Sequence, residues 1–510
     1  MRAVSLMHLP IELHTSIMKF LLSLSRQPEL SWGFIPPLGF PVIWEWIERD
    51  LRSESLFPFN AASVCKLWHN ILAGIPECWT RVVFDLASDP GPFLNAFLWS
   101  RSLEKIDVAI FNSSEYAEEV DEALENERIS AIAQALQLHV HRCRSIVIDT
   151  IYSSSIPSPN IFFLRDAPNL YTLFLEFRID NFDASTHPSP PTLGEEQPTF
   201  ATSFPVLCRL SVPAFWLIDM ALFAPDAEWL KQLYPSFMRI TIAKFEFPEN
   251  GPYSLTNLLS CLCLLKEPSS ISLRELTLSY EYSGHNLNSP DRSSIAYTIS
   301  SFADIHFKST SKDFIAHLYS VANVVSNERL TFEDCEIPNI SHLQNARNLC
   351  LENIPDKQGL SLRNILASWE GSNLTIRSCP SFDDTLLFWL RSEGVYLDSE
   401  GNGIRFMFPA KCLCSLHIYN CVDFTSPALV DVIGFRKDAH TTFVELEAAN
   451  TDGLVLHTLT SSIYSLSVNE RGPTLTQEGM DWFFTNEEDI SVSWHTEDDE
   501  GEVHVFSCGI

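Results

Sequence analysis

The chain has 510 residues, of which 45% are hydrophobic and 19% charged, so its composition is that of a globular protein and excludes a disordered one. Its 65 acidic residues outnumber its 34 basic residues and give a formal charge of -31, which argues against nucleic acid and anionic membranes as partners. Residues 1–86 carry 7 basic and 8 acidic residues, so the remaining charge of -30 lies downstream. We therefore expect the two ends of the chain to differ in role.

The sequence shows no secretory or membrane-anchoring pattern. Pro10 and Glu12 interrupt the first residues, which lack the apolar core of a signal peptide. The longest apolar stretches, around residues 213–224 and 254–265, are too short to cross a bilayer. Without a secretory signal, the 13 cysteines indicate a reducing compartment and unlinked thiols. We expect a cytoplasmic or nuclear location, or both, and no membrane partner.

A first helix is predicted to begin within residues 9–13, Leu-Pro-Ile-Glu-Leu. A proline is tolerated in the first helical turn, and Glu12 favours the positive end of the helix dipole. The residues of its apolar face recur at spacings of three and four and are Leu13, Ile17, Phe20, Leu21 and Leu24.

Two more helices and a strand are predicted before residue 87. The first of these helices covers residues 41–52, after a stretch rich in proline and aromatic residues. The next covers residues 61–72 and is ended by Gly74 and Pro76. A short strand follows at residues 82–84.

Three sequence motifs occur in order in this region. They are Leu-Pro-x-Glu-Leu at residues 9–13, Val-Cys-Lys-x-Trp at residues 64–68, and a tryptophan after a proline within residues 76–79. Together they resemble an F-box, with an insertion at about residues 25–60. The resemblance implies a small, all-helical F-box-like domain over residues 1–86.

An F-box also implies a partner. F-box helices dock into a groove on a Skp-family adaptor, which links them to a cullin scaffold and so to a ubiquitin ligase. In helix-in-groove binding, a few apolar anchors supply most of the affinity. The adaptor-binding positions that the resemblance implies are Leu9, Pro10, Ile17, Val64, Cys65 and Trp68. Amphipathic helices at these spacings also form the plain core of small helical domains, which is the alternative interpretation.

The rest of the chain contains a degenerate repeat. The leucine-rich repeat places aliphatic residues on the buried side of a short strand in the pattern L-x-x-L-x-L. Five segments match at all three positions: Leu170/Leu173/Leu175, Leu207/Leu210/Val212, Leu273/Leu276/Leu278, Leu413/Leu416/Ile418 and Ile463/Leu466/Val468. Weaker matches are Leu330/Phe332, Ala346/Leu349/Leu351, Leu374/Ile376 and Phe443/Leu446, and earlier strands are expected at residues 106–108 and 146–148.

Two further signals favour a repeat of strands and helices. The full repeat places Asn or Cys three residues after the last aliphatic, where Cys335, Cys379 and Cys421 stand. Helix-like apolar stripes precede two of the strands and consist of Ile129, Ile132, Leu136 and Val140, and of Phe314, Ile315, Leu318 and Val321. The alternation predicts an irregular leucine-rich-repeat-like α/β solenoid with a curved parallel sheet over residues 87–495.

Two polar segments are set apart from the repeat. Residues 183–203 are rich in proline and contain two adjacent glutamates, which is typical of a long polar loop. Ile490, Val492 and Trp494 alternate as a last strand suited to a cap. Residues 496–510 are then expected to be an acidic C-terminal tail end around residues 497–500.

The sequence carries no motif of an enzyme or a metal site. G-x-S-x-G, H-E-x-x-H, Walker and G-x-G-x-x-G patterns are absent. His139 and His141 are two residues apart and would face opposite ways on a helix. The pairs Cys261/Cys263 and Cys412/Cys414 lack the C-x-x-C spacing of a redox or zinc pair. We expect no catalytic residue, no cofactor and no metal.

These observations lead to one function and two alternatives. The leading function is the substrate-recognition subunit of an SCF-type cullin-RING ubiquitin ligase, which performs no bond chemistry itself. The chain is similar to fungal-type F-box proteins with degenerate C-terminal repeats, and its acidic charge suggests a target with a basic surface. The alternatives are a leucine-rich-repeat interaction scaffold without ligase coupling and an enzyme with an unrecognised site in the solenoid.

Overall fold

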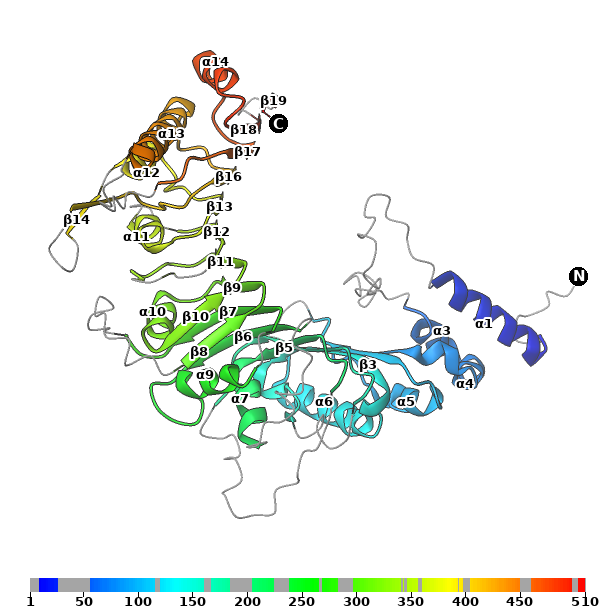
Figure 1. The fold of residues 1–510 in the computed structure, drawn as a ribbon. Helices are drawn as coiled ribbons and strands as arrows, with labels where there is room; N and C mark the ends of the chain where they lie inside the picture. The colour runs from blue at the N-terminus through cyan, green and yellow to red at the C-terminus, as the bar shows by residue number, and fades with distance from the viewer. Residues whose placement is uncertain are drawn as a thin grey trace, which may run out of the picture. The chain divides into compact units, whose positions relative to one another are not determined.

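The structure is a computed structural model. It describes residues 9–25, 56–114, 120–159, 167–183, 204–223, 238–265, 268–282, 297–340, 343, 346–355, 360–392, 394–397, 404–449, 460–497 and 503–509. The protein is mixed α/β with a large and mostly parallel sheet, and it divides into two compact units, Met1–Tyr234 and Pro235–Ile510. Figure 1 shows both units and labels their helices and strands where there is room. The helix expected over residues 41–52 and most of the loop expected over residues 183–203 lie outside the described residues.

The first unit begins with short helices. They are α1 (Ile11–Ser25), α3 (Phe59–Val64), α4 (Lys66–Ala73) and the 3-10 helix η2 (Pro76–Thr80). The carbonyl oxygen of Pro10 accepts hydrogen bonds from the amides of Leu13 (3.0 Å) and His14 (3.3 Å), so α1 begins where the sequence predicts. α1 packs against α4, and α4 packs against α3.

The single helix predicted over residues 61–72 is wrong, because the structure has two. Cys65 separates α3 from α4 with an extended backbone (φ -162°, ψ 161°), which no α-helix accommodates. Ala61 and Ala62 are buried on α3, and Ile71 and Leu72 are buried on α4. No proline or glycine marks the break, and the helical spacing of apolar residues continues across it. The sequence therefore gives no sign of the break. Packing of the two buried pairs therefore overrides the local pattern.

The strands of the first unit pair in chain order and in parallel. They are β1 (Arg81–Asp85), β2 (Ile106–Phe111), β3 (Cys143–Tyr152), β4 (Thr172–Ile179) and β5 (Arg209–Pro213). Between and after them lie η3 (Gly91–Phe93), α5 (Ala96–Trp99), α6 (Glu122–Gln137), η5 (Val140–Arg142), η6 (Ser153–Ser155) and α7 (Ala214–Phe223). Because β1 pairs with β2, residues 81–85 belong to the sheet, and the helical part ends before the boundary predicted at residue 86.

Polar side chains hold the strand ends of the first unit. The buried carboxyl group of Glu125 on α6 accepts hydrogen bonds from the Asn112 side chain (2.8 Å) and from the Ser155 hydroxyl (2.8 Å). It also accepts bonds from the amides of Ile151 (2.9 Å) and Tyr152 (3.1 Å). One carboxyl group thus joins a helix, the residue after β2 and the end of β3.

A buried arginine plays a comparable part at the end of α5. The guanidinium of Arg142 is hydrogen-bonded to the carbonyl oxygens of Arg101 (2.6 Å), Leu103 (3.3 Å) and Phe97, and to the Ser100 hydroxyl (2.8 Å). Burial lowers its pKa from the ordinary value. Arg142 directly follows His141 of the candidate His139/His141 pair, and its guanidinium binds the backbone carbonyl groups of residues 97–103.

The second unit also has strands that pair in chain order. They are β6 (Arg239–Phe247), β7 (Ser270–Leu278), β9 (Asp304–Lys308), β11 (Arg329–Glu333), β12 (Asn348–Glu352), β13 (Asn373–Arg377), β16 (Ser415–Tyr419), β17 (Ser465–Arg471), β18 (Ser491–Glu497) and β19 (Val503–Cys508). All neighbours are parallel from β6 to β18, and β19 is antiparallel to β18.

Helices and two small sheets connect these strands. The helices are α9 (Leu255–Cys263), α10 (Lys312–Val321), α11 (Leu360–Ser368), α12 (Asp384–Arg391), α13 (Ser426–Ala449) and α14 (Gln477–Thr485). β8 (Tyr297–Ser301) pairs with β10 (Ala322–Ser326) in parallel, and β14 (Gly394–Leu397) pairs with β15 (Ile404–Met407) in antiparallel fashion.

Most of the predicted strand aliphatics are buried, and they lie opposite one another in neighbouring strands. Leu330, Leu349 and Leu374 are in register across β11, β12 and β13. The aliphatics of four of the five full matches, those around Leu173, Leu210, Leu416 and Leu466, are all buried. Both predicted helical stripes are also buried, on α6 and its following turn and on α10, except for the half-buried Val321.

A left-handed residue follows or interrupts most strands of the second unit. These residues are not glycines, and their φ angles lie between 44° and 66°: Lys244, Glu275, Ser309, Asp334, Asn353, Ser378, Asn420 and Glu470. After each of the five-residue strands β9, β11, β12, β13 and β16, the amide of this residue donates to a carbonyl of the next strand in the sheet, at 2.9–3.1 Å. Each repeat therefore ends in the same turn, and the turn is bonded to its neighbour.

The residue after this turn points into the core. Cys335, Cys379 and Cys421 occupy that position and are buried, and each Sγ lies 3.1–3.4 Å from the carbonyl oxygen two residues earlier. The equivalent positions in other repeats are Thr310, also buried, and Ile354. The cysteines thus belong to the repeat, as their spacing predicts.

Two strand assignments made from the sequence are wrong, and two strands of the sheet, β6 and β9, were not predicted. At Leu273/Leu276/Leu278 the frame is wrong, because Ile271 and Leu273 align with Ile305 and Phe307 of β9, and Glu275 turns the chain before Leu276. Phe443 and Leu446 lie in helix α13. The aliphatics of β6 and β9 match the repeat in the structure, although the pattern search misses both strands.

The last strand of the chain also differs from the prediction. The last strand is β19 and not the strand at Ile490–Trp494, so the expected acidic tail end is in part a strand. β19 runs back along β18, with Phe506 opposite Trp494. Of the acidic residues 497–500, only Glu497 lies within the described residues, at the end of β18.

Candidate partner-binding surfaces

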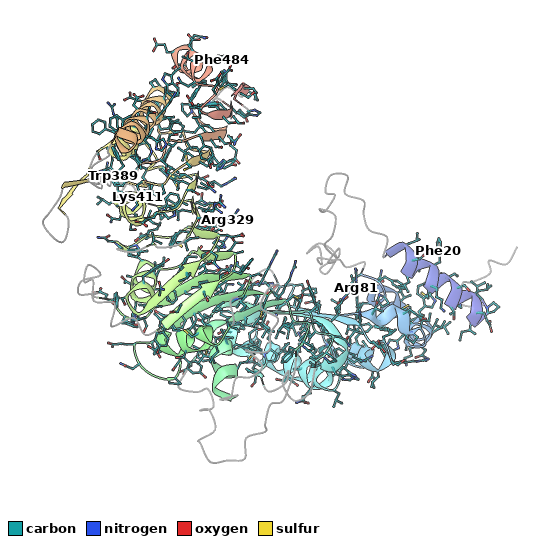
Figure 2. The ribbon with its side chains drawn as sticks, in the orientation of Figure 1. Phe20, Arg81, Arg329, Trp389, Lys411 and Phe484 are labelled. Carbon is teal, nitrogen blue, oxygen red and sulfur yellow. The ribbon has the colours of Figure 1, made fainter. Side chains whose placement is uncertain are left out.

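Helix α1 presents an apolar face to solvent. The face predicted from the sequence is exposed and not buried: Leu13 (49%), Ile17 (37%), Phe20 (62%), Leu21 (36%) and Leu24 (48%). These residues span about 100° of the helix. Figure 2 marks Phe20 on this helix. A contiguous exposed apolar surface of this kind is typical of a binding site for another protein.

The side of α1 that faces α4 is a different one. His14 and Met18 are the residues of α1 that are fully buried. They are offset from the exposed face, so α1 rests on α4 along one edge. The core of this helical part is therefore narrower than the sequence pattern suggests, and the larger part of the apolar surface is left outside it.

The six candidate adaptor-binding residues lie on these adjoining helices. Pro10, Ile17 and Val64 are exposed, and Leu9, Cys65 and Trp68 are half-buried. Leu9 and Pro10 begin α1, Val64 and Cys65 form the junction between α3 and α4, and Trp68 lies in the first turn of α4. Sequence reasoning left out Leu13, Phe20 and Leu24 as candidate contacts. Their spacings of four, three and seven residues from Ile17 are the signal that identifies them.

Two nitrogen atoms at the joint of α1 and α4 have no hydrogen-bond partner within the described part of the chain. They are Nε2 of His14 and Nε1 of Trp68, and both are buried. An unsatisfied buried donor costs about 1–3 kcal/mol. The Trp68 indole is therefore a buried donor that lowers the stability of this joint.

An aromatic cluster fixes α4 to the start of the sheet. The indole of Trp79, which is fully buried, donates to the Leu72 carbonyl (2.8 Å) at the end of α4. Its ring lies 5.5 Å from Phe59 and 4.7 Å from Trp99, between ring centroids. Trp79 comes directly before β1, so the tryptophan of the third motif joins the helices to the sheet.

A second candidate surface is the face of the sheet opposite the buried aliphatics in the second unit. Its middle row of side chains consists of small polar residues and two histidines: Ser272, His306, Thr331, Cys350, Thr375, His417, Ser467 and Ser493. Burial lowers the pKa of both His306 and His417. This row is therefore uncharged at neutral pH.

A row of charges runs beside it, and its members pair with one another. Lys308 contacts Glu333, whose pKa is lowered because Lys308 and His306 outweigh the effect of burial. Arg377 lies 2.9 Å from Glu470, and its guanidinium carbon is 4.5 Å from the centre of the Tyr419 ring. Both signs of charge occur on this face, so the acidic excess of the chain lies mainly elsewhere.

All 13 cysteines lie within the described residues, and none of them forms a disulfide bond. Burial raises the pKa of Cys335 and Cys421 to about 11 and that of Cys379 to about 12, so their thiols stay protonated at neutral pH. Metal binding requires thiolates. Among the described residues, no group of His, Cys, Asp and Glu is placed to hold a metal ion.

Comparisons with known proteins do not place the chain in a family. No family model, no curated protein and no solved structure matches it. Among the described residues, no helix is both long and apolar enough to traverse a bilayer.

Proposed function

We propose that the protein is a substrate-recognition subunit of an SCF-type ubiquitin ligase. The exposed apolar face of α1, next to the motif residues at the junction of α3 and α4, carries this proposal. The helices bind a Skp-family adaptor, and the strand–helix repeats form a leucine-rich-repeat-like solenoid that binds a protein target. The choice of a Skp-family adaptor as the partner comes from the F-box resemblance of the sequence.

Burial of the α1 face supplies the affinity for the adaptor. A large apolar side chain contributes about 1.5–3 kcal/mol when it moves from water into a groove. Phe20, Leu24 and Leu13 are about half exposed, so their burial in the complex contributes most of this binding free energy. Ile17 belongs to the same face, and Val64 adds an exposed apolar side chain at the second motif.

The repeats supply a rigid support for the target. The turns of neighbouring repeats are bonded to one another at the left-handed residues, so the side chains on the open face keep fixed spacings. The protein then acts through proximity, because it holds a target lysine close to a charged ubiquitin-conjugating enzyme.

Co-purification with a Skp-family adaptor tests the proposal. The double variant Ile17→Ala/Phe20→Ala removes exposed side chains, so it leaves the fold intact and weakens adaptor binding at least about tenfold. The matched control is Phe388→Ala/Val422→Ala, which removes exposed apolar groups (70% and 57% exposed) from the second unit. We expect the control to bind like the wild type.

The alternative function is a repeat scaffold without ligase coupling. Leu9 and Val64 are 55 positions apart in the sequence, and the break at Cys65 sets the orientation of α4. Failure of the folded wild type to bind the adaptor at micromolar concentration overturns the ligase proposal and favours the scaffold. Equal binding by wild type and Ile17→Ala/Phe20→Ala shows that α1 does not carry the contact.

A further inference from the structure

Strand β19 forms the last edge of the sheet in the second unit. Within the described residues, β18 is the one strand that pairs with it, along its whole length from Val503 to Cys508. In an antiparallel pair, every second residue of a strand directs its N–H and C=O groups away from the partner strand. The outer side of β19 therefore presents backbone donors and acceptors to a further strand. Figure 1 shows β18 and β19 close to the C-terminus.

β19 lacks the features that keep edge strands from pairing. Such strands are commonly very short, or they contain a lysine, a proline or a bulge. The six residues of β19, Val-His-Val-Phe-Ser-Cys, include no lysine or proline, and they pair with β18 in regular register without a bulge. The strand is also held in place, because Phe506 is buried and its ring lies 6.2 Å from that of Phe483 on α14, between centroids. β19 is thus a fixed edge that contains no obstacle to a further strand.

Exposed apolar side chains lie on both faces of the sheet at this edge. Val503 (67% exposed) and Val505 (63%) alternate with the buried Phe506, so they lie on the open face. Phe484 of α14 (54%) lies on the other face, where its ring centroid is 5.1 Å from that of Phe506. Figure 2 labels Phe484. Because successive side chains of a strand point to opposite faces, an added strand covers the valines with one set of side chains and Phe484 with the other.

A carboxylate stands near each end of β19. Glu497, the last residue of β18, lies opposite Val503 at the start of the strand. Glu487 follows α14 and lies near Cys508 at the other end, where burial and then the negative charge of Glu487 raise the pKa of the Cys508 thiol. Both carboxylates are exposed. Charge complementarity therefore favours a strand with a basic residue at each end, and it opposes a second copy of this acidic chain.

We propose that β19 binds an extended segment of a partner protein as an additional strand. The segment has apolar residues over about six positions, the length of β19, and a lysine or arginine at each end. Backbone hydrogen bonds to β19 supply affinity, the exposed valines and Phe484 select apolar side chains, and the two carboxylates select the basic ends. The inference rests on the proposed function in one respect, because it describes a segment of the protein target.

Fluorescence anisotropy on the full chain tests this site with the fluorescein-labelled peptide Lys-Val-Thr-Val-Thr-Val-Thr-Lys. Val503→Asp/Val505→Asp removes two exposed apolar groups and adds two negative charges. Diffuse attraction of a basic peptide to an acidic chain would become stronger in this variant, whereas strand addition becomes about tenfold weaker because the apolar contact is lost. Unchanged or tighter binding by the folded variant overturns the proposal.

The matched control is Phe388→Asp/Val422→Asp, which makes the same change of charge at exposed apolar positions elsewhere in the second unit. We expect it to bind the peptide within about twofold of the wild type. Thermal melting of both variants checks the fold. Equal weakening by the variant and the control overturns the assignment of the site to β19.

Methylated peptides test the backbone contact without any change to the protein. One peptide carries N-methyl groups on its odd-numbered residues and another on its even-numbered residues. Only one of these two sets of amides faces β19 in an added strand, so we expect one peptide to lose at least about tenfold in affinity and the other to keep it. Equal affinities of the two methylated peptides overturn strand addition.

Sedimentation velocity of the full chain without peptide tests the other occupant, a second copy. We expect no dimer that depends on β19. A wild-type dimer that dissociates in Val503→Asp/Val505→Asp overturns the partner assignment, because the edge is then occupied by the chain itself.

Adaptor co-purification on the same samples separates this inference from the proposed function. Absence of strand addition in a chain that binds the adaptor overturns this inference alone. Strand addition to a chain that does not bind the adaptor overturns the ligase proposal and leaves the edge site in place.

Discussion

The two units contain parallel strands in chain order but stabilise the ends of those strands in different ways. In the second unit, the same backbone turn recurs, with a left-handed residue and then a buried position, often cysteine. In the first unit, Arg101 is the one described non-glycine residue with positive φ, and individual polar side chains such as Glu125 and Arg142 join the strand ends. The ends of the strands can thus be stabilised by a recurring backbone turn or by hydrogen bonds from individual side chains.

The difference has a consequence for mutation. In the second unit, the left-handed residues form the same turn in several repeats. A single substitution therefore affects one turn among several. In the first unit, Glu125 accepts four hydrogen bonds. Arg142 has a counterpart in the second unit, because the buried guanidinium of Arg436 donates to the carbonyl oxygens of Pro409, Ala410 and Lys411. We therefore expect the largest single-residue effect at Glu125.

Glu125→Ala tests this expectation most strongly. The change leaves four hydrogen-bond donors without their acceptor, among them the amides of Ile151 and Tyr152. We expect a loss of about 3–5 kcal/mol in the free energy of unfolding, measured by chemical denaturation. Glu127→Ala, an exposed residue of the same helix, is the control and should cost little. A similar small loss for both variants would mean that the carboxyl group of Glu125 does not hold this unit together.

Cys379 makes the stability of the second unit depend on alkaline pH. Its pKa rises from 9.0 to about 12 on burial, so above pH 9 the unfolded chain loses a proton that the folded chain keeps. Stability is therefore complete below about pH 9 and falls by about 1.4 kcal/mol per pH unit above it. We expect Cys379→Ala to remove this part of the alkaline slope. Ile354→Ala, at the equivalent position of the preceding repeat, should lower stability without changing the slope; identical slopes for the wild type and Cys379→Ala would contradict the prediction.

Asn353 tests the left-handed turn itself, with the smallest expected effect. Its φ is 51° and its side chain is exposed, so substitutions there act mainly through the backbone. Asn353→Val is expected to cost about 1 kcal/mol, because a β-branched residue is strained in this region. Asn353→Gly should be neutral or slightly stabilising. Equal denaturation midpoints for the two variants would contradict the prediction. A higher midpoint for Asn353→Val than for Asn353→Gly would contradict it too.

The sequence predicts the repeated strands better than the helices at the start of the chain, because a repeated structure repeats its signal. The strands at Leu330, Leu349 and Leu374 carry the same aliphatic spacing, and Cys335 and Cys379 mark the same buried position. The left-handed turns themselves escape prediction, since none of them uses glycine. At Glu275 this turn falls inside β7. Leu276 and Leu278 match the leucine spacing but follow the turn, whereas the strand positions of the repeat are Ile271 and Leu273.

The candidate site is predictable in part. The motifs identify Leu9, Pro10 and Val64, but helical spacing alone does not tell a buried face from an exposed one. α1 buries His14 and Met18 because α4 meets it at that edge, a tertiary contact that no local pattern encodes. The break at Cys65 has the same origin.

The reversal of direction at β19 bears on how such a chain changes in length. Gene duplication adds a copy of a strand and helix, and a copy inserted between parallel neighbours finds matching hydrogen-bonding partners on both sides. β19 runs opposite to β18, so a copied repeat placed after it would meet a strand of the wrong polarity. A copied strand–helix repeat therefore fits best between two parallel neighbours inside the array, where the pairing that it needs is already present.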